Sequence, residues 1–118
     1  MMWTQAEAIA LCVKIENICT QFGCHVALTG GLLYKEGPRK DCDILFYRIR
    51  QTKINEEGLF KALNGIGITD ISGFGFVFKS NYEGKRLEIF FPESDGEYPL
   101  KEPPIPESTL AEADGDLF

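Results

Sequence analysis

The sequence predicts an α+β fold in which helices pack on one face of a small, mixed β-sheet. Three patterns predict it: apolar residues recur at helical spacing before residue 23, short apolar runs separated by turn signals follow, and a β-rich segment fills residues 71–92. The expected order of elements is α-β-α-β-α-β-β. A chain of 118 residues that is 44% hydrophobic can bury one modest core, so a single globular domain is expected.

The first element is predicted to be an amphipathic helix of about five turns. Thr4 and Glu7 form a capping-box pattern at its start, and Gly23 is placed to end it. Its apolar stripe consists of Ala8, Leu11, Cys12, Ile15, Ile18, Cys19 and Phe22.

Two strands and a short helix are expected next. The run "HVALTG" at 25–30 predicts a buried strand, and "LLYKEG" at 32–37 predicts the start of a short helix before a Gly37-Pro38 turn. The run "CDILFYRI" at 42–49 predicts the second strand.

The second half of the body is expected to hold one helix and a β-hairpin. Residues 55–64 predict the helix, although Gly58 weakens it. Residues 71–92 divide at 81–84 into two arms that form a hairpin. The alternating aromatic residues of the first arm and the Phe-Phe pair of the second are interpreted as core, namely Phe74, Phe76, Phe78, Phe90 and Phe91.

Charge divides the chain into two parts, a domain at 1–92 and an acidic, proline-rich tail at 93–118. The domain carries eleven basic and ten acidic residues, whereas the tail carries one basic and eight acidic residues. The tail has no sustained periodicity, so it is expected to be extended or disordered. The near-neutral domain is not expected to attract nucleic acid in bulk. No membrane span or signal peptide is expected, which favours a cytoplasmic location.

The four cysteines and the single histidine do not predict a zinc site. Cys12, Cys19, Cys24 and Cys42 form no C-x-x-C pair, and His25 is the only histidine. We interpret the cysteines as small buried hydrophobic residues in a reducing compartment, and His25 as a structural residue.

Three carboxylates in strand-like surroundings are the strongest indication of chemistry. Asp41 and Asp43 open the second strand and project from one face, roughly 7 Å apart. Glu88 lies within the apolar run "RLEIFF". If its strand pairs beside the second strand in register, three oxygen donors converge, which suits two Mg²⁺ or Mn²⁺ ions.

A glycine pair and a basic loop accompany these acids. Gly30 and Gly31 follow the first strand, where backbone N–H groups can approach phosphates without obstruction. Several basic residues surround the aspartates and could steer a phosphate-bearing ligand; they are Lys35, Arg39, Lys40, Arg48, Arg50 and Lys53. Tyr34 and Tyr47 are better placed than the phenylalanines to touch a base, although packing is the favoured role for them too.

The segments "ALTGGLLYKEGPRKDCDILFY" and "RLEIFF", within residues 26–91, resemble the signature of the nucleotidyltransferase superfamily related to DNA polymerase beta. The resemblance implies a minimal nucleotidyltransferase core. It implies that Gly30 and Gly31 contact the nucleotide phosphates, that Asp41 and Asp43 hold both metals, and that Glu88 holds the metal that activates the acceptor hydroxyl.

The activity that the resemblance implies is transfer of a nucleoside monophosphate from a nucleoside triphosphate to a hydroxyl group. Lys35, Arg39 and Lys40 would then grip the triphosphate, and a protein partner or a second copy of the chain would complete the acceptor site. An inactive module that binds a nucleotide or a protein is the alternative function. A purely structural interpretation also stays open. In it, Asp41 caps a turn after Lys40, Asp43 pairs with Arg39 or Lys40, and Glu88 pairs with Lys85, Arg86 or Arg48.

Overall fold

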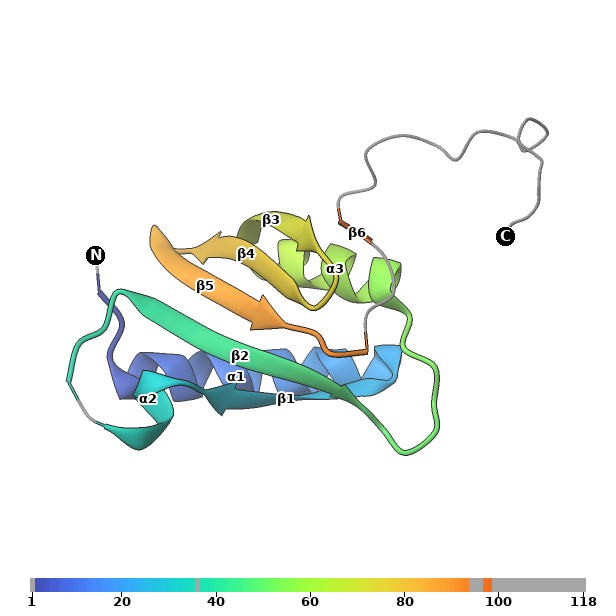
Figure 1. The fold of residues 1–118 in the computed structure, drawn as a ribbon, viewed down its shortest axis with the longest axis horizontal. Coiled ribbons are helices and arrows are strands. Elements are labelled where there is room, and N and C mark those ends of the chain that lie inside the picture. Colours follow the sequence, from blue (N-terminus) through green and yellow to red (C-terminus); the bar gives the residue numbers. More distant parts are fainter. Residues whose placement is uncertain (1, 36, 94–96, 99–118) are drawn as a thin grey trace.

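The structure, a computed structural model, describes residues 2–35, 37–93 and 97–98 (Figure 1). Its helices and strands are, in chain order, α1 (Gln5–Cys19), the 3-10 helix η1 (Thr20–Phe22), β1 (Cys24–Thr29), α2 (Gly31–Tyr34), β2 (Asp41–Arg48), α3 (Glu56–Gly65), β3 (Ile68–Phe74), β4 (Val77–Tyr82), β5 (Lys85–Phe90) and β6 (Glu97–Tyr98).

The start of α1 is fixed by the capping box that the sequence predicts. The Glu7 N–H donates to Thr4 Oγ1 at 3.2 Å, and the Thr4 N–H donates to Glu7 Oε1 at 2.9 Å. These bonds satisfy two backbone donors that a helix start leaves free. After η1, Gly23 adopts a left-handed conformation with φ of 94°, which turns the chain into β1.

The six strands form one mixed sheet in the order β1-β2-β5-β4-β3-β6. Only β2 and β5 pair in parallel, and the other neighbours pair antiparallel. Figure 1 shows β2 and β5 side by side, although α3, β3 and β4 separate them in the chain. The predicted α+β class with a small mixed sheet is therefore confirmed.

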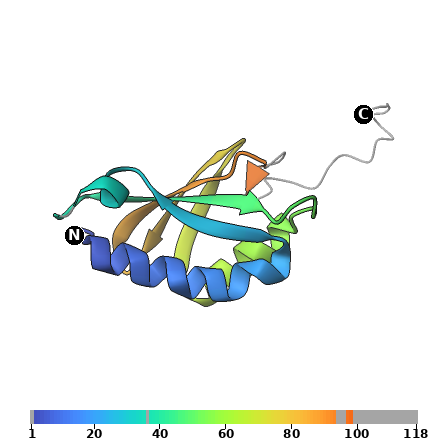
Figure 2. The same ribbon diagram turned by 90° about the horizontal axis from the view of Figure 1, so that it is seen from below.

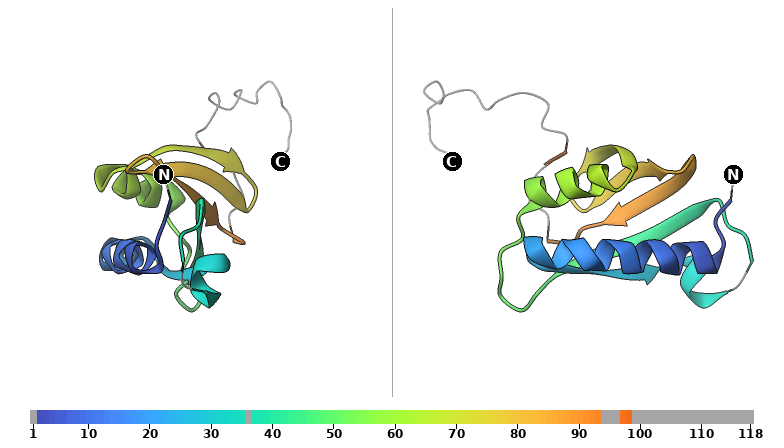
Figure 3. Two further views of the ribbon diagram at one scale, coloured as in Figure 1. Left: turned by 90° about the vertical axis from the view of Figure 1, so that its left-hand side faces the viewer. Right: turned by 180° about the vertical axis from the view of Figure 1, so that it is seen from behind.

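The two longer helices lie on the same side of the sheet. Figure 2 shows α1 and α3 beneath it, and the view from behind in Figure 3 shows them together in front of it. Between them and the sheet lies an aromatic cluster in which the Phe60 ring is 5.1 Å from Phe78 and 6.0 Å from Phe91. Cys42, Ile44 and Phe46 are also buried on this face. Alternate β2 residues, including both aspartates, therefore occupy the opposite face.

The β-rich segment contains three strands rather than the expected two. The turn between β4 and β5 forms at Glu83 and Gly84, which both have positive φ values, 53° and 80°. A second turn, at Gly75 and Phe76, divides the first predicted arm into β3 and β4. The alternation of glycine and phenylalanine across this turn concealed it. The predicted strand at 25–30 also differs, because β1 is an edge strand and is mostly half-buried.

Residues of the predicted tail are described at two places only. Glu93 lies 3.3 Å from Arg48 in an ion pair, and β6 pairs antiparallel with the end of β3. The prediction for 94–96 and 99–118 lies outside the described residues. Among the helices that the structure describes, none is long and apolar enough to cross a membrane.

Candidate functional site

The strand register brings the three predicted acids to one face of the sheet. Asp43 of β2 and Glu88 of β5 occupy directly paired positions. Asp41 lies two residues before Asp43, on the same face and opposite Arg86. The acids thus come from neighbouring parallel strands and project from the face opposite α1 and α3.

The cations that a purely structural interpretation assigns to Glu88 have other partners. Arg86 pairs with Asp41 at 3.3 Å, and Lys85 lies 3.7 Å from Glu7 and 3.8 Å from Glu83. Arg48 pairs with Glu93. Within the described residues, Asp43 and Glu88 make no ion pair, although Lys79 faces Glu88 in the β4–β5 register. Ion pairing within the fold therefore does not account for these two acids.

The acids interact electrostatically. Burial, followed by the nearby charges of Glu88 and Asp41, raises the pKa of Asp43 above its ordinary value. A raised carboxyl pKa means that the fold disfavours the charged form. A positive charge at this position would relieve the repulsion.

The acids do not enclose a metal ion as they stand. In the described part of the chain, no three histidine, cysteine or acidic side chains form a group suited to holding one. Oδ1 of Asp41 is buried and accepts no hydrogen bond within the described structure, but it lies 3.3 Å from Arg86 Nε in an ion pair. Arg86 therefore already occupies this oxygen.

Gly30 makes room for Asp43. A Cβ atom at Gly30 would overlap Oδ2 of Asp43, and the backbone at Gly30 has φ of 75° and ψ of −157°, a region that is essentially restricted to glycine. The sequence assigned Gly30 to phosphate contact. The structure gives it an additional role that spacing did not reveal, which is to accept the Asp43 carboxylate against the backbone.

Gly31 has a similar relation to Arg39. A Cβ atom at Gly31 would lie 2.9 Å from Arg39 Nε, so the guanidinium group lies over the glycine pair. Of the predicted basic residues, Arg39 is thus held beside Gly31. Lys35 and Lys40 are exposed on the loop between α2 and β2.

Trp3, which the sequence did not mark as part of a site, fixes this loop. Its N–H donates to the Arg39 carbonyl at 2.7 Å, and the Arg39 N–H donates to the Trp3 carbonyl at 2.9 Å. The indole Nε1–H donates to the Arg86 carbonyl of β5 at 2.6 Å, and the side chain is fully buried. Trp3 therefore ties the segment that enters β2 to the start of β5. A tryptophan near the start of the chain was the only sequence signal for this role.

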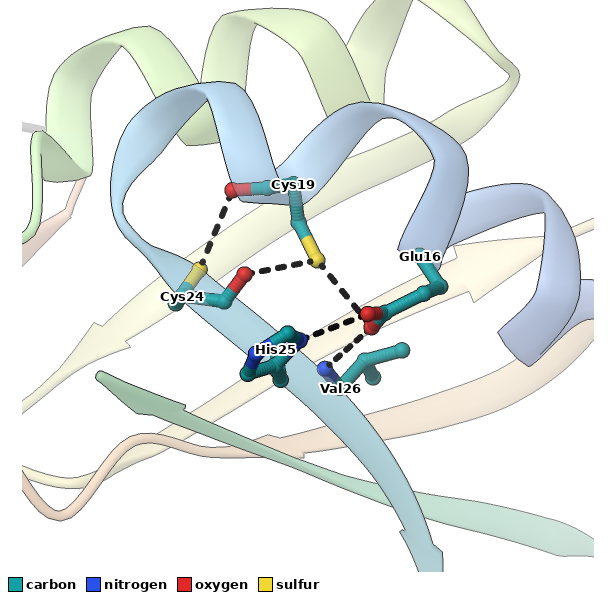
Figure 4. A network of polar contacts seen from close by, with 5 residues as sticks. All are labelled: Glu16, Cys19, Cys24, His25 and Val26. Carbon is teal, nitrogen blue, oxygen red and sulfur yellow. Dashed lines mark hydrogen bonds and ion pairs between the residues drawn. The ribbon is translucent and has the colours of Figure 1, made fainter. Parts of the chain in front are cut away.

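The cysteines and His25 form structural contacts (Figure 4). The Glu16 carboxylate lies 2.6 Å from His25 Nδ1 and accepts the Val26 N–H at 3.1 Å. The Cys19 thiol donates to the Cys24 carbonyl at 3.3 Å.

The other two cysteines are held in the thiol form. Burial raises the pKa of Cys12 to about 11. Burial, followed by the neighbouring Cys12 and Asp43, raises the pKa of Cys42 to about 12. Cys12 and Cys42 are therefore protonated thiols at neutral pH, which makes them poor metal ligands.

The two predicted tyrosines lie apart from one another. Tyr34 is 79% exposed at the end of α2. Tyr47 lies near the far end of β2, with its ring 5.5 Å from that of His25. Tyr47 alternates with the aspartates along β2, but it lies four residues beyond Asp43 and contacts His25.

The chain matches no protein-family model and no curated protein. The resemblance to nucleotidyltransferases accordingly rests on the sequence motifs alone.

Proposed function

We propose that the protein is a metal-dependent nucleotidyltransferase that moves a nucleoside monophosphate from a nucleoside triphosphate to a hydroxyl acceptor. The observation that carries the proposal is the pairing of Asp43 with Glu88 across parallel strands, with Asp41 on the same face. Asp43 and Glu88 make no ion pair within the described residues, and like charges opposite one another in a sheet cost stability, so a functional role explains their pairing best. The proposal places the chain in the superfamily related to DNA polymerase beta.

The donor set fits Mg²⁺ or Mn²⁺. Asp41, Asp43 and Glu88 supply carboxylate oxygens, which these hard cations prefer. The raised pKa of Asp43, which reflects burial and the charges of Glu88 and Asp41, is the feature that a cation would relieve. When bound, two such ions would supply Lewis-acid charge to the triphosphate and the acceptor hydroxyl.

The residues around the acids have separate tasks in this proposal. Gly30 keeps the Asp43 carboxylate against the backbone, and Arg39, held over Gly31, offers its guanidinium group to a triphosphate oxygen. Lys35 and Lys40 add exposed positive charge on the same loop, which attracts the polyanionic substrate. Arg86 balances the charge of Asp41 before a cation arrives.

The alternative function, an inactive module that binds a nucleotide or a protein, is favoured by one observation. Arg86 occupies the position beside Asp41, with its Nε 3.3 Å from Asp41 Oδ1. An arginine in place of a metal ion can hold a phosphate without supporting catalysis.

A protein partner or a second copy of the chain would complete the acceptor site of an active enzyme.

Calorimetric titration with Mn²⁺ and each nucleoside triphosphate tests the proposal. We expect metal-dependent binding to the native chain and its loss in the Asp41→Ala, Asp43→Ala double variant. Glu57→Ala is the control, because Glu57 is an exposed acid that pairs with Lys61 on α3. Release of pyrophosphate from the bound nucleotide would identify an enzyme. Equal binding with and without metal would favour the inactive module, and no binding to the native chain would refute the proposal.

A further inference from the structure

A hollow of about 350 Å³ adjoins Asp43 on this face of the sheet. Its apolar walls are Leu45, Phe76, Phe90 and Pro92. Its polar end is formed by Thr29, Gly30 and Asp43, so Asp43 belongs both to the hollow and to the acid cluster.

The register explains why charge changes to apolar surface at this place. Leu45 follows Asp43 by two residues and Phe90 follows Glu88 by two residues, so they occupy the same face. Leu45 and Phe90 are themselves a directly paired position of β2 and β5. An apolar pair thus lies roughly 7 Å along the strands from the acidic pair.

Phe76 is held at the hollow although its ring is 61% exposed. It lies in the turn between β3 and β4, and its carbonyl accepts the Phe91 N–H at 2.7 Å, which fixes the turn against the end of β5. The sequence interpretation placed Phe76 in the core with Phe78. That interpretation is wrong for Phe76, because the turn at Gly75 breaks the alternation, whereas Phe78 is fully buried. It is also wrong for Phe90, which is half-buried at the hollow and not in the core.

We propose that this hollow binds the planar base of the nucleoside triphosphate, with Phe76 and Phe90 as its apolar and stacking contacts. This inference rests on the proposed function, because it places the phosphates at Asp43 and the base at the adjoining apolar pair. The arrangement matches that of a nucleotide, which has a polyanionic triphosphate at one end and a flat, largely apolar base at the other. Aromatic side chains stack on every base, so the contacts do not depend on the identity of the base.

The test compares two probes in the presence of Mn²⁺, a nucleoside triphosphate and inorganic triphosphate, which lacks the base. We expect the nucleoside triphosphate to bind the native chain more tightly. Phe76→Ala should weaken its binding by about 5- to 150-fold, the loss expected for one stacking ring. Binding of inorganic triphosphate should be unchanged, and Phe76→Trp should retain the native affinity for the nucleotide.

Phe90→Leu and Tyr47→Ala complete the design. Phe90→Leu keeps apolar packing at a half-buried position but removes the ring. It should weaken binding of the nucleoside triphosphate and leave binding of inorganic triphosphate unchanged. Tyr47→Ala removes a 44% exposed aromatic side chain from β2, outside the hollow, and should change neither affinity.

The outcomes separate this inference from the proposed function. If inorganic triphosphate binds the native chain as tightly as the nucleotide, the acid site stands and the base site is refuted. If Phe76→Ala leaves nucleotide binding unchanged or weakens both probes equally, the base site is likewise refuted. If neither probe binds the native chain with Mn²⁺, both proposals fail.

Discussion

Replacing Asp43 with asparagine is expected to stabilise the metal-free protein. Asp43 faces Glu88 at a directly paired position and has Asp41 two residues away on the same face. Each directly opposed pair of like charges costs about 0.2–1 kcal/mol. With the more distant Asp41 and the burial of Asp43 added, Asp43→Asn should raise the free energy of unfolding by roughly 1 kcal/mol, which corresponds to about 4–8 °C in Tm.

The gain should depend on pH in a defined direction. The pKa of Asp43 is raised above its ordinary value of 3.8 by burial and by the neighbouring acids. The native chain therefore holds this proton more tightly than the unfolded chain does. Ionisation of Asp43 destabilises the fold as the pH rises from 3.8 through the raised pKa, and the full cost is present above it. The advantage of Asp43→Asn should consequently be present at neutral pH and absent below 3.8.

Urea denaturation in the presence of a chelator measures this effect, with the fluorescence of the single, fully buried Trp3 as the signal. Glu57→Gln is the control, because it breaks an exposed ion pair with Lys61 and should lower stability by no more than about 0.5 kcal/mol. Added Mn²⁺ should then stabilise the native chain and not Asp43→Asn. A metal-free Asp43→Asn protein that is less stable than the native chain would refute the reasoning, because Asp43 would then make favourable contacts within the fold.

Three further predictions follow from individual contacts. Gly30→Ala should lose about 1–3 kcal/mol of stability to backbone strain and at least about tenfold in Mn²⁺ affinity. Gly67→Ala, where φ is 102° and a Cβ atom makes only an ordinary contact, should lose stability alone. Equal Mn²⁺ affinities of the two variants in calorimetry would contradict this. Trp3→Phe keeps an aromatic ring but leaves the Arg86 carbonyl without its donor, and should cost about 1–3 kcal/mol in urea denaturation; an unchanged midpoint would show that the bond contributes nothing. Burial opposes ionisation of Glu16, but hydrogen bonds from a backbone N–H and an imidazole outweigh it and lower the pKa of Glu16 below 4.5. The stabilisation by Glu16 is therefore present above pH 4.5 and lost as the pH falls through the lowered pKa. Glu16→Gln should flatten the acid limb of the plot of unfolding free energy against pH, and parallel plots for the two proteins would argue against this.

Local patterns predicted the elements that local interactions determine. The capping box at Thr4 and the apolar spacing along α1 identified that helix, because both depend on residues within a few turns. The turn at Glu83 and Gly84 was found for the same reason. Division of the predicted first arm at Gly75 was missed, because a glycine between aromatic residues is compatible with a strand or with a turn.

The site was predictable in its residues but not in its geometry. Spacing alone placed Asp41 and Asp43 on one face, since alternation within a strand is a local property. The register that sets Glu88 opposite Asp43 depends on pairing between distant segments, which no local pattern encodes. The contact between Gly30 and Asp43 and the bridge from Trp3 to Arg39 were unpredictable for the same reason.

The parallel pairing of β2 with β5 also determines when the acids can meet during folding. The hairpin of β4 and β5 forms from neighbouring residues. Pairing of β2 with β5 instead requires closure of the long segment between them, which contains α3, β3 and β4. Such long-range pairing carries a loop-closure cost and is slow to form. A partly folded chain that contains only the hairpin has Glu88 without the two aspartates. A cation bound by all three acids would thus hold the finished structure together, slowing its unfolding without accelerating the formation of the hairpin.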